Sequence, residues 1–260
     1  MKKILAAVLA AAVLFASACG NYSVSFQEGE NGYVVNIVPE DKEDAGEEII
    51  GGNIVGGWTV NGDLTEAGIT DEEKEIFEKA LEGLVGASYV PVAVLAKQLV
   101  SGTNYLFLAA ETLVTADPVD KTACVTVYQD LEGNITLLGI ENVDITDFTD
   151  EEDEDDEDDD LLGAWSINEA LTAAELPAEV QEAFDAAMET LLGVDYTPVA
   201  YLGSQVVAGK NYAILCKAVT VTAEPVTSLK VVIVFDGVNG QREVRQVSNF
   251  ELEDYVEIGD

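Results

Sequence analysis

The sequence predicts an α+β protein made of two similar domains, in each of which an antiparallel β-sheet of four to five strands wraps around one α-helix. The first observation behind this prediction is an internal repeat. At an offset of 107 residues, 54–148 aligns with 161–255 without a gap, and Trp58 falls on Trp165. About a third of the aligned pairs are identical, which indicates a duplicated unit of domain size. The second observation is that each repeat begins with one segment of helical periodicity and continues with four β-rich runs, an order typical of α+β domains.

Residues 1–18 have the form of a bacterial export signal. Two lysines precede a short apolar run, and the small residues Ala16-Ser17-Ala18-Cys19 follow it. Cleavage before Cys19 resembles the processing of bacterial lipoproteins, in which this cysteine carries the lipid, although Ala16 stands where such signals usually have leucine. The same small residues also fit ordinary secretion. We therefore expect an exported protein that is lipid-anchored at Cys19 to the bacterial membrane and faces outside the cytoplasm, with secretion as the alternative.

The segments before and between the repeats are acidic. Asp150–Asp160 is a run of eleven acidic residues, which repels itself and predicts an extended, solvated linker. This run lacks the glycine and the ligand spacing of an EF-hand loop, so we expect no specific metal site in it. A short strand is predicted at 33–38, ended by Pro39. The expected organisation is a signal peptide at 1–18, a mostly disordered tether at 19–53, domain 1 at 54–148, an acidic linker at 149–160 and domain 2 at 161–260.

Each repeat has one predicted helix. In the first repeat the helix begins with the capping box Thr70-Asp71-Glu72-Glu73, in which the threonine hydroxyl and the Glu73 carboxylate each accept from the other residue's backbone amide. In the second, Pro177 occupies the first turn. Gly86 and Gly193 are expected to close the two helices. The apolar stripes at helical spacing are Ile76, Phe77, Ala80, Leu81 and Leu84 in one copy and Val180, Phe184, Ala187, Met188 and Leu191 in the other.

Four runs rich in β-forming residues follow the first helix, and their counterparts lie 107 residues further on. Glycine, asparagine and aspartate separate the runs, so consecutive strands are expected to pair as antiparallel hairpins. The runs are apolar on both faces, and alternation therefore does not distinguish an inward face. A fifth strand is expected near Trp58, and the four runs span 89–100, 104–115, 122–129 and 135–145.

Composition excludes several classes of function. Fifty Asp and Glu against twelve Lys and Arg give a formal charge of −38, which opposes binding to a nucleic-acid backbone. The chain has no histidine, so Ser-His and Cys-His catalysis and histidine metal ligands are excluded. We expect no enzymatic activity, no cofactor and no metal. Cys124 and Cys216 lie in apolar runs of different repeats, and they predict two buried free thiols rather than a disulfide.

Three short motifs recur in both repeats. The residues Gln98-Leu99-Val100-Ser101-Gly102 and Gln205-Val206-Val207-Ala208-Gly209 resemble the QxVxG hairpin of cystatins, the protein inhibitors of papain-like cysteine proteases. Upstream, Ile54-Val55-Gly56 and Leu161-Leu162-Gly163 are similar to the cystatin N-terminal trunk, in which two apolar residues precede a glycine. Downstream, Leu131-Glu132-Gly133 and Val238-Asn239-Gly240 take the place of the second inhibitory hairpin, without the proline or tryptophan that cystatins carry there.

This resemblance implies two cystatin-like domains and a reversible, non-covalent inhibitor of papain-like cysteine proteases on the bacterial surface. The trunk and the two hairpins are expected to form a three-part wedge that enters the protease cleft. Small tip residues allow the backbone to approach closely, and the glycines Gly102 and Gly209 are expected where the turns need a positive φ. Aliphatic residues are expected to fill apolar pockets. The implied state is a monomer that contacts the membrane through its lipid alone and binds no nucleic acid. The alternative is a non-inhibitory binding or structural lipoprotein of the cell surface, because function does not follow from fold.

Overall fold

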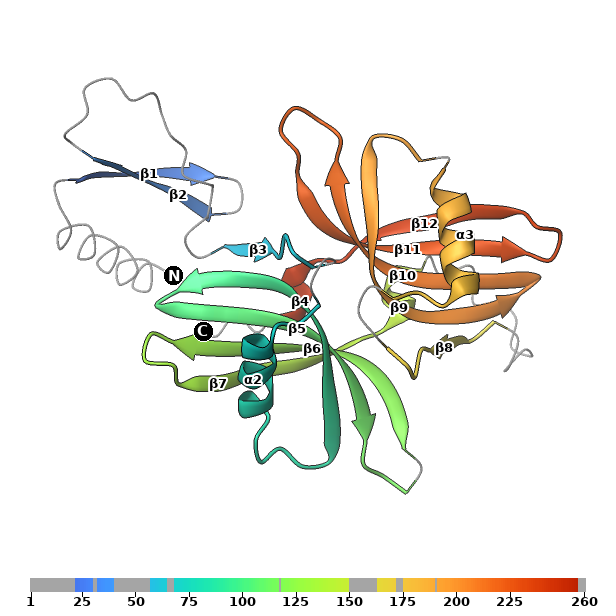
Figure 1. The fold of residues 1–260 in the computed structure, drawn as a ribbon, viewed down its shortest axis with the longest axis horizontal. Helices are drawn as coiled ribbons and strands as arrows, with labels where there is room; N and C mark the ends of the chain where they lie inside the picture. The colour runs from blue at the N-terminus through green and yellow to red at the C-terminus, as the bar shows by residue number, and fades with distance from the viewer. Residues whose placement is uncertain are drawn as a thin grey trace.

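The protein is mostly β-sheet in its computed structural model (Figure 1). The model describes residues 22–29, 32–39, 57–64, 68–116, 118–149, 163–171, 175–189 and 191–256. Within these ranges the strands form one two-stranded and two five-stranded antiparallel sheets, accompanied by two α-helices and two 3-10 turns. Cys19 and the acidic run 150–160 lie outside the described residues.

The first repeat builds a sheet in the order β3-β4-β5-β6-β7. Its helix starts as predicted, because Thr70 Oγ1 accepts from Glu73 N at 3.2 Å and Glu73 Oε2 accepts from Thr70 N at 3.0 Å. Gly86 does not close this helix, which ends earlier, at Ala80. The elements are β3 (Trp58–Val60), α2 (Asp71–Ala80), β4 (Ala87–Val100), β5 (Gly102–Leu113), β6 (Val119–Asp130), β7 (Ile135–Val143) and the 3-10 turn η1 (Ile145–Phe148).

The second repeat builds the corresponding sheet in the order β8-β9-β10-β11-β12. Pro177 directly precedes the first turn of its helix, which ends before Gly193. Both glycines expected to close helices therefore lie beyond the helix ends. The elements are β8 (Trp165–Ile167), α3 (Ala178–Met188), β9 (Val194–Val207), β10 (Gly209–Thr220), β11 (Thr227–Gly237), β12 (Arg242–Asn249) and the 3-10 turn η2 (Leu252–Tyr255).

A separate hairpin precedes the first repeat. Strand β1 (Tyr22–Gly29) pairs antiparallel with β2 (Gly32–Pro39), from Tyr22 opposite Pro39 to Gly29 opposite Gly32. Strand β2 contains the strand predicted at 33–38, and β1 is its partner, which the sequence did not indicate. Part of the predicted tether is therefore β-structure.

The prediction that each sheet wraps around its own helix, as in two cystatin-like domains, is wrong. Alternate residues of β5 point to opposite faces of the sheet: Phe107 and Ala109 pack in the cluster beneath α2, whereas Leu106 and Leu108 belong to a different cluster. A ten-residue helix is about 15 Å long and covers only part of one sheet face. The other face needs a second cover, and this need explains why the strands are apolar on both sides.

That second cover is the other repeat. In β10, Ile214 packs in the cluster beneath α3, and Leu215 joins Leu106 and Leu108 in one shared cluster. This cluster combines buried residues of both sheets and of both 3-10 turns. The layers therefore run from α2 through two sheets to α3, with the largest apolar cluster between the sheets.

Specific contacts tie the two repeats together at this interface. The Phe148 ring stacks on Phe250 with centroids 5.7 Å apart, and Phe250 stacks on Tyr255 at 4.6 Å. Lys217 Nζ donates to Gly62 O at 2.8 Å, which joins the second repeat to the first. The repeats consequently form one packed body.

Candidate protein-binding edges

The two predicted inhibitory hairpins of the first repeat, the β4–β5 and β6–β7 turns, lie at one end of its sheet. Gly102 lies opposite Asp130, and Trp58 lies opposite Gln98. Because paired strands are about 5 Å apart, the β4–β5 turn lies between its two neighbours, the entry to β3 on one side and the β6–β7 turn on the other. We name the end formed by 98–102 and 130–134 edge 1. Its predicted trunk residues Ile54, Val55 and Gly56 lie outside the described residues.

The second repeat brings its segments together in the same way. Gly209 lies opposite Gly237, and Trp165 lies opposite Gln205. The Gln205 side-chain amide donates to the carbonyl of Gly163, so the last residue of the predicted trunk is attached to the hairpin. We name the end formed by 205–209, 237–241 and Gly163 edge 2. Its trunk residues Leu161 and Leu162 lie outside the described residues.

Both edges expose apolar side chains beside small tip residues. Leu131 is 84% exposed and its counterpart Val238 is 90% exposed. Leu99, Val206 and Val207 are also exposed, as are the tips Ser101 and Ala208. Around them, Gln98, Val100 and Gln205 are half-buried, whereas Glu132, Gly133, Asn239 and Gly240 are exposed.

Glycine is required at both hairpin tips. Gly102 has a φ of +130°, and a Cβ there would meet Gln129 O at 2.2 Å. Gly209 has a φ of +148°, and a Cβ there would meet Asp236 O at 2.4 Å. The predicted positive φ is confirmed at both positions, and each tip lies directly against the neighbouring strand.

The second turn of edge 1 is held by an aspartate. Asp130 Oδ1 accepts from Glu132 N and Asn134 N, both at 2.8 Å, and Asp130 Oδ2 accepts from Asn134 Nδ2 at 2.7 Å. These hydrogen bonds lower the pKa of Asp130 below its ordinary value, and the one from the Asn134 side chain has the largest effect. The carboxylate therefore stays ionised, and the turn keeps a fixed shape.

A tyrosine that the sequence motifs did not indicate supports the tip of edge 1. The Tyr128 hydroxyl donates to the backbone carbonyl of Ser101. The corresponding residue in edge 2 is Phe235, which has no hydroxyl. The tip of edge 1 is thus fixed by a hydrogen bond that edge 2 lacks.

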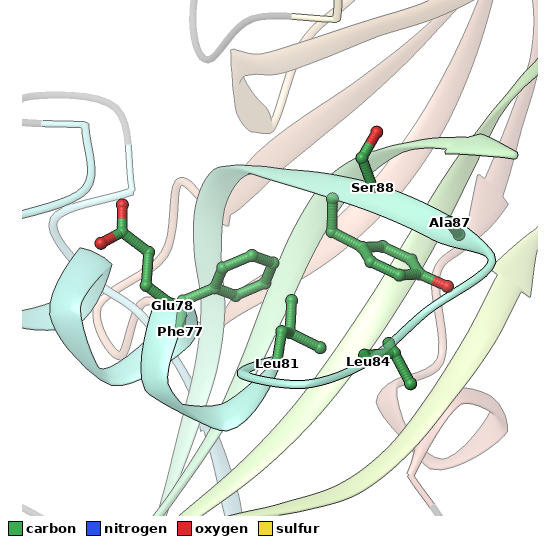
Figure 2. A pocket seen from close by; sticks show the side chains of 7 residues that line it. Phe77, Glu78, Leu81, Leu84, Ala87 and Ser88 are labelled. Carbon is green, nitrogen blue, oxygen red and sulfur yellow. The ribbon is translucent and has the colours of Figure 1, made fainter. Parts of the chain in front are cut away.

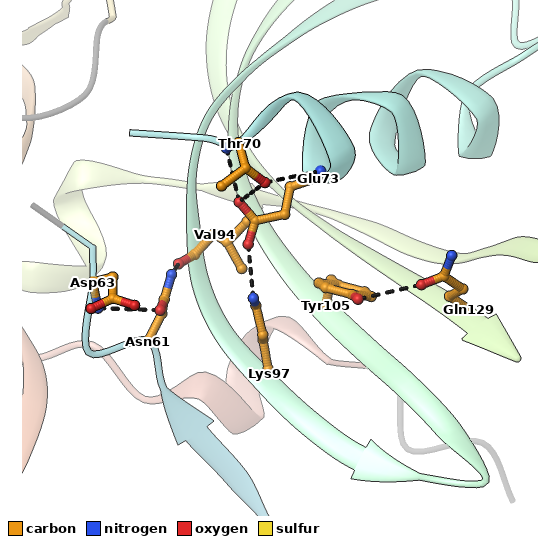
Figure 3. A network of polar contacts seen from close by, with 8 residues as sticks. All are labelled: Asn61, Asp63, Thr70, Glu73, Val94, Lys97, Tyr105 and Gln129. Carbon is orange, nitrogen blue, oxygen red and sulfur yellow. Dashed lines mark hydrogen bonds and ion pairs between the residues drawn. The ribbon is translucent and has the colours of Figure 1, made fainter. Parts of the chain in front are cut away.

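A polar network lies behind edge 1 and connects α2 to β4 (Figure 3). Lys97 Nζ lies 2.8 Å from Glu73 Oε1, and Thr70 donates to Glu73 Oε2. Burial raises the pKa of Glu73, but the hydrogen bonds from Lys97 and Thr70 outweigh it and hold the pKa below its ordinary value. Asn61 Nδ2 also donates to Val94 O at 3.0 Å, which joins the segment after β3 to β4. The network fixes the strand that leads into the tip.

Two cavities are present in the described part of the chain, and the larger one adjoins edge 2 at Gly163 and Gln205. One of about 230 Å³ opens between the end of α2 and the start of β4, where Figure 2 shows Phe77, Leu81 and Leu84 around it. A larger one of about 630 Å³ lies between the repeats, lined by Thr122 and Asn142 of one and by Trp165 and Gln205 of the other. Neither cavity contains the exposed apolar tips.

Two cysteines lie in the described part of the chain. The thiols of Cys124 and Cys216 are free and buried, as predicted, and burial raises the pKa of both. No cluster of three or more potential metal ligands occurs among the described residues. In the same part of the chain, no helix combines the length and apolar character needed to cross a membrane.

Comparison with known proteins does not supply a family. No protein-family model matches the chain, and no curated protein sequence matches it. The functional interpretation therefore depends on the residues at the two edges.

Proposed function

We propose that this chain is a reversible, non-covalent inhibitor of papain-like cysteine proteases, displayed outside the bacterial cytoplasm. The observation that supports the proposal is that two turns and the start of the edge strand lie at one end of each sheet. In edge 1, the pairs Gly102–Asp130 and Trp58–Gln98 set this arrangement. In edge 2, Gly209–Gly237 and Trp165–Gln205 set it in the same way.

The shape of each edge suits insertion into a cleft. Ser101 and Ala208 are small and exposed, and each precedes a glycine that lies tightly against the next strand. A narrow tip of this kind can approach a protease backbone closely. Because the turns are held by sheet pairing, little conformational entropy is lost on binding.

The exposed aliphatic residues supply the affinity. Leu131 and Val238 are exposed in the second turns, and Leu99 and Val206 are exposed in the first hairpins at the same end of each sheet. Apolar side chains at the centre of an interface contribute most when they become fully desolvated. Each edge therefore combines a narrow tip with apolar anchors on both sides.

The chemistry of the edges is that of a binder. Both thiols are buried away from the edges, so they cannot form a covalent bond with the protease nucleophile. Complex formation is therefore expected to be fully reversible. Localisation at the cell surface through Cys19 is part of the proposal and follows from the N-terminal signal.

Steady-state inhibition of papain by the full chain tests the proposal. The variant Ser101→Phe/Ala208→Phe enlarges both exposed tips and is expected to weaken inhibition by about thirtyfold or more, as for a lost hot spot. Glycine is left intact because any Cβ at Gly102 or Gly209 would meet backbone. The matched control is Val114→Phe/Val221→Phe, at equivalent exposed positions at the far ends of the sheets, and it is expected to inhibit like the wild type.

Two results would sink the proposal: no inhibition of a panel of papain-like proteases at micromolar concentration, or unchanged inhibition by the tip variant. The second candidate is a non-inhibitory surface binder, favoured by the absence of proline and tryptophan at Leu131-Glu132-Gly133 and Val238-Asn239-Gly240. Salt-sensitive capture of basic proteins that survives in the tip variant supports this candidate.

A further inference from the structure

The two edges point away from each other. In Figure 1 the β4–β5 and β6–β7 turns lie at the left end of the molecule, and the β9–β10 and β11–β12 turns lie at the right end. The cavity between the repeats supports this view. It is lined by Gln205 of edge 2 and by Thr122 of the first repeat, so edge 2 lies near Thr122. Thr122 lies near the start of β6, whereas edge 1 lies at its end, at Asp130. Strand β6 has twelve residues, and a strand of that length extends for about 40 Å.

The shared core fixes this arrangement. Phe148, Phe250 and Tyr255 stack across the junction, and Ser248 Oγ donates to Phe148 O at 2.9 Å. The repeats cannot turn their edges toward the same partner without breaking these contacts. A protein bound at one edge consequently leaves the opposite edge open.

The two edges also differ in charge. The second turn of edge 1, 130–134, carries the carboxylates of Asp130 and Glu132 and no cation. The equivalent turn of edge 2, 237–241, is uncharged. Lys210 beside the tip of edge 2 is paired with Glu179, at 3.4 Å. Edge 1 is therefore locally anionic, and edge 2 is locally close to neutral.

We propose that the chain binds two protease molecules at once through non-equivalent edges, edge 1 selecting a protease with a cationic rim around its cleft. This inference rests on the proposed inhibitory function and adds its stoichiometry and its selectivity. Charged rim residues mainly change the association rate and the salt dependence of a complex. Binding at edge 1 is therefore salt-sensitive, and binding at edge 2 depends chiefly on apolar contact.

Native mass spectrometry and calorimetry of the full chain test this with a papain-like protease chosen for its net positive charge at pH 7. The wild type is expected to bind two protease molecules. Each single tip variant is expected to bind one protease molecule. Edge 2 stays intact in Ser101→Phe, and edge 1 stays intact in Ala208→Phe. Raising NaCl from 50 to 500 mM is expected to weaken the edge 1 complex by about fivefold and the edge 2 complex by less than about twofold. Adding Glu132→Gln to Ala208→Phe is expected to reduce that salt response.

Each outcome bears on a different part of the proposal. A wild-type complex with one protease molecule, together with intact inhibition, overturns the two-site inference and leaves the inhibitory function standing. Two sites with the same salt response overturn the electrostatic distinction. Complete absence of a complex overturns both the inference and the proposed function.

Discussion

Replacing Phe250 with alanine is expected to destabilise both repeats together. Phe250 is 3% exposed and stacks on aromatic rings 5.7 and 4.6 Å away, one of them from the other repeat. Truncating a buried phenylalanine costs about 3–5 kcal/mol. With a urea m value of about 3 kcal/mol/M for a protein of this size, the unfolding midpoint should fall by about 1–1.7 M.

The two tryptophans allow each repeat to be followed separately. Trp58 and Trp165 are the only tryptophans, and each packs against the shared core from its own repeat. Trp58→Phe and Trp165→Phe therefore leave one fluorescent reporter in either repeat. We expect both reporters to show the same midpoint and to shift together when Phe250→Ala is added.

A matched control is Val247→Ala in β12, the strand that ends directly before Phe250. Its side chain is 39% exposed, and a shift below about 0.5 M is expected. A shift of the Trp165 reporter alone on Phe250→Ala would contradict a shared core. Separate unfolding midpoints for the two reporters would also contradict it, because the repeats would then be independent domains.

Three further predictions concern single residues. Glu73→Gln should lower the urea midpoint of unfolding at pH 7. This difference from the wild type should shrink as the pH falls below the ordinary pKa of 4.5, because a carboxylate with a lowered pKa stabilises the fold only while it is ionised. An equal difference at pH 3 would contradict this. Tyr128→Phe removes a hydrogen bond to Ser101 and should weaken protease binding at edge 1 by about two- to tenfold. Calorimetry in the Ala208→Phe background measures this, because only edge 1 binds there. In the Ser101→Phe background, Phe235→Tyr is the reverse test at edge 2. The thiols of Cys124 and Cys216 should react with a thiol reagent only after unfolding, since both are buried and their pKa is raised; rapid labelling of the native protein would refute their placement.

Local signals in the sequence predicted local structure well. The strand runs, the strand at Trp58 and the capping box at Thr70 depend on neighbouring residues, and the structure contains all of them. The convergence at the edges also follows from hairpin topology, since consecutive antiparallel strands bring alternate turns to the same end. The positive φ of Gly102 and Gly209 could be predicted because each glycine follows a small residue in the tight turn between two strand runs.

The architecture could not be predicted because it depends on contacts between distant residues. Leu106 and Phe107 are both large and apolar, so the sequence shows that both faces of β5 are covered and does not show what covers them. The cover of the second face comes from residues more than a hundred positions away, such as Leu215. The contact of Tyr128 with Ser101 was missed for a similar reason, because it crosses between strands.

Hydrogen–deuterium exchange of the full chain, with and without saturating papain, tests most directly whether the two edges are the protease-binding surfaces. The account predicts slower exchange in 98–104, 130–134, 205–211 and 237–241, and unchanged exchange at the opposite sheet ends, in 84–90 and 112–119. Protection confined to those opposite ends, or unchanged exchange at both edges in a protease complex, would contradict it.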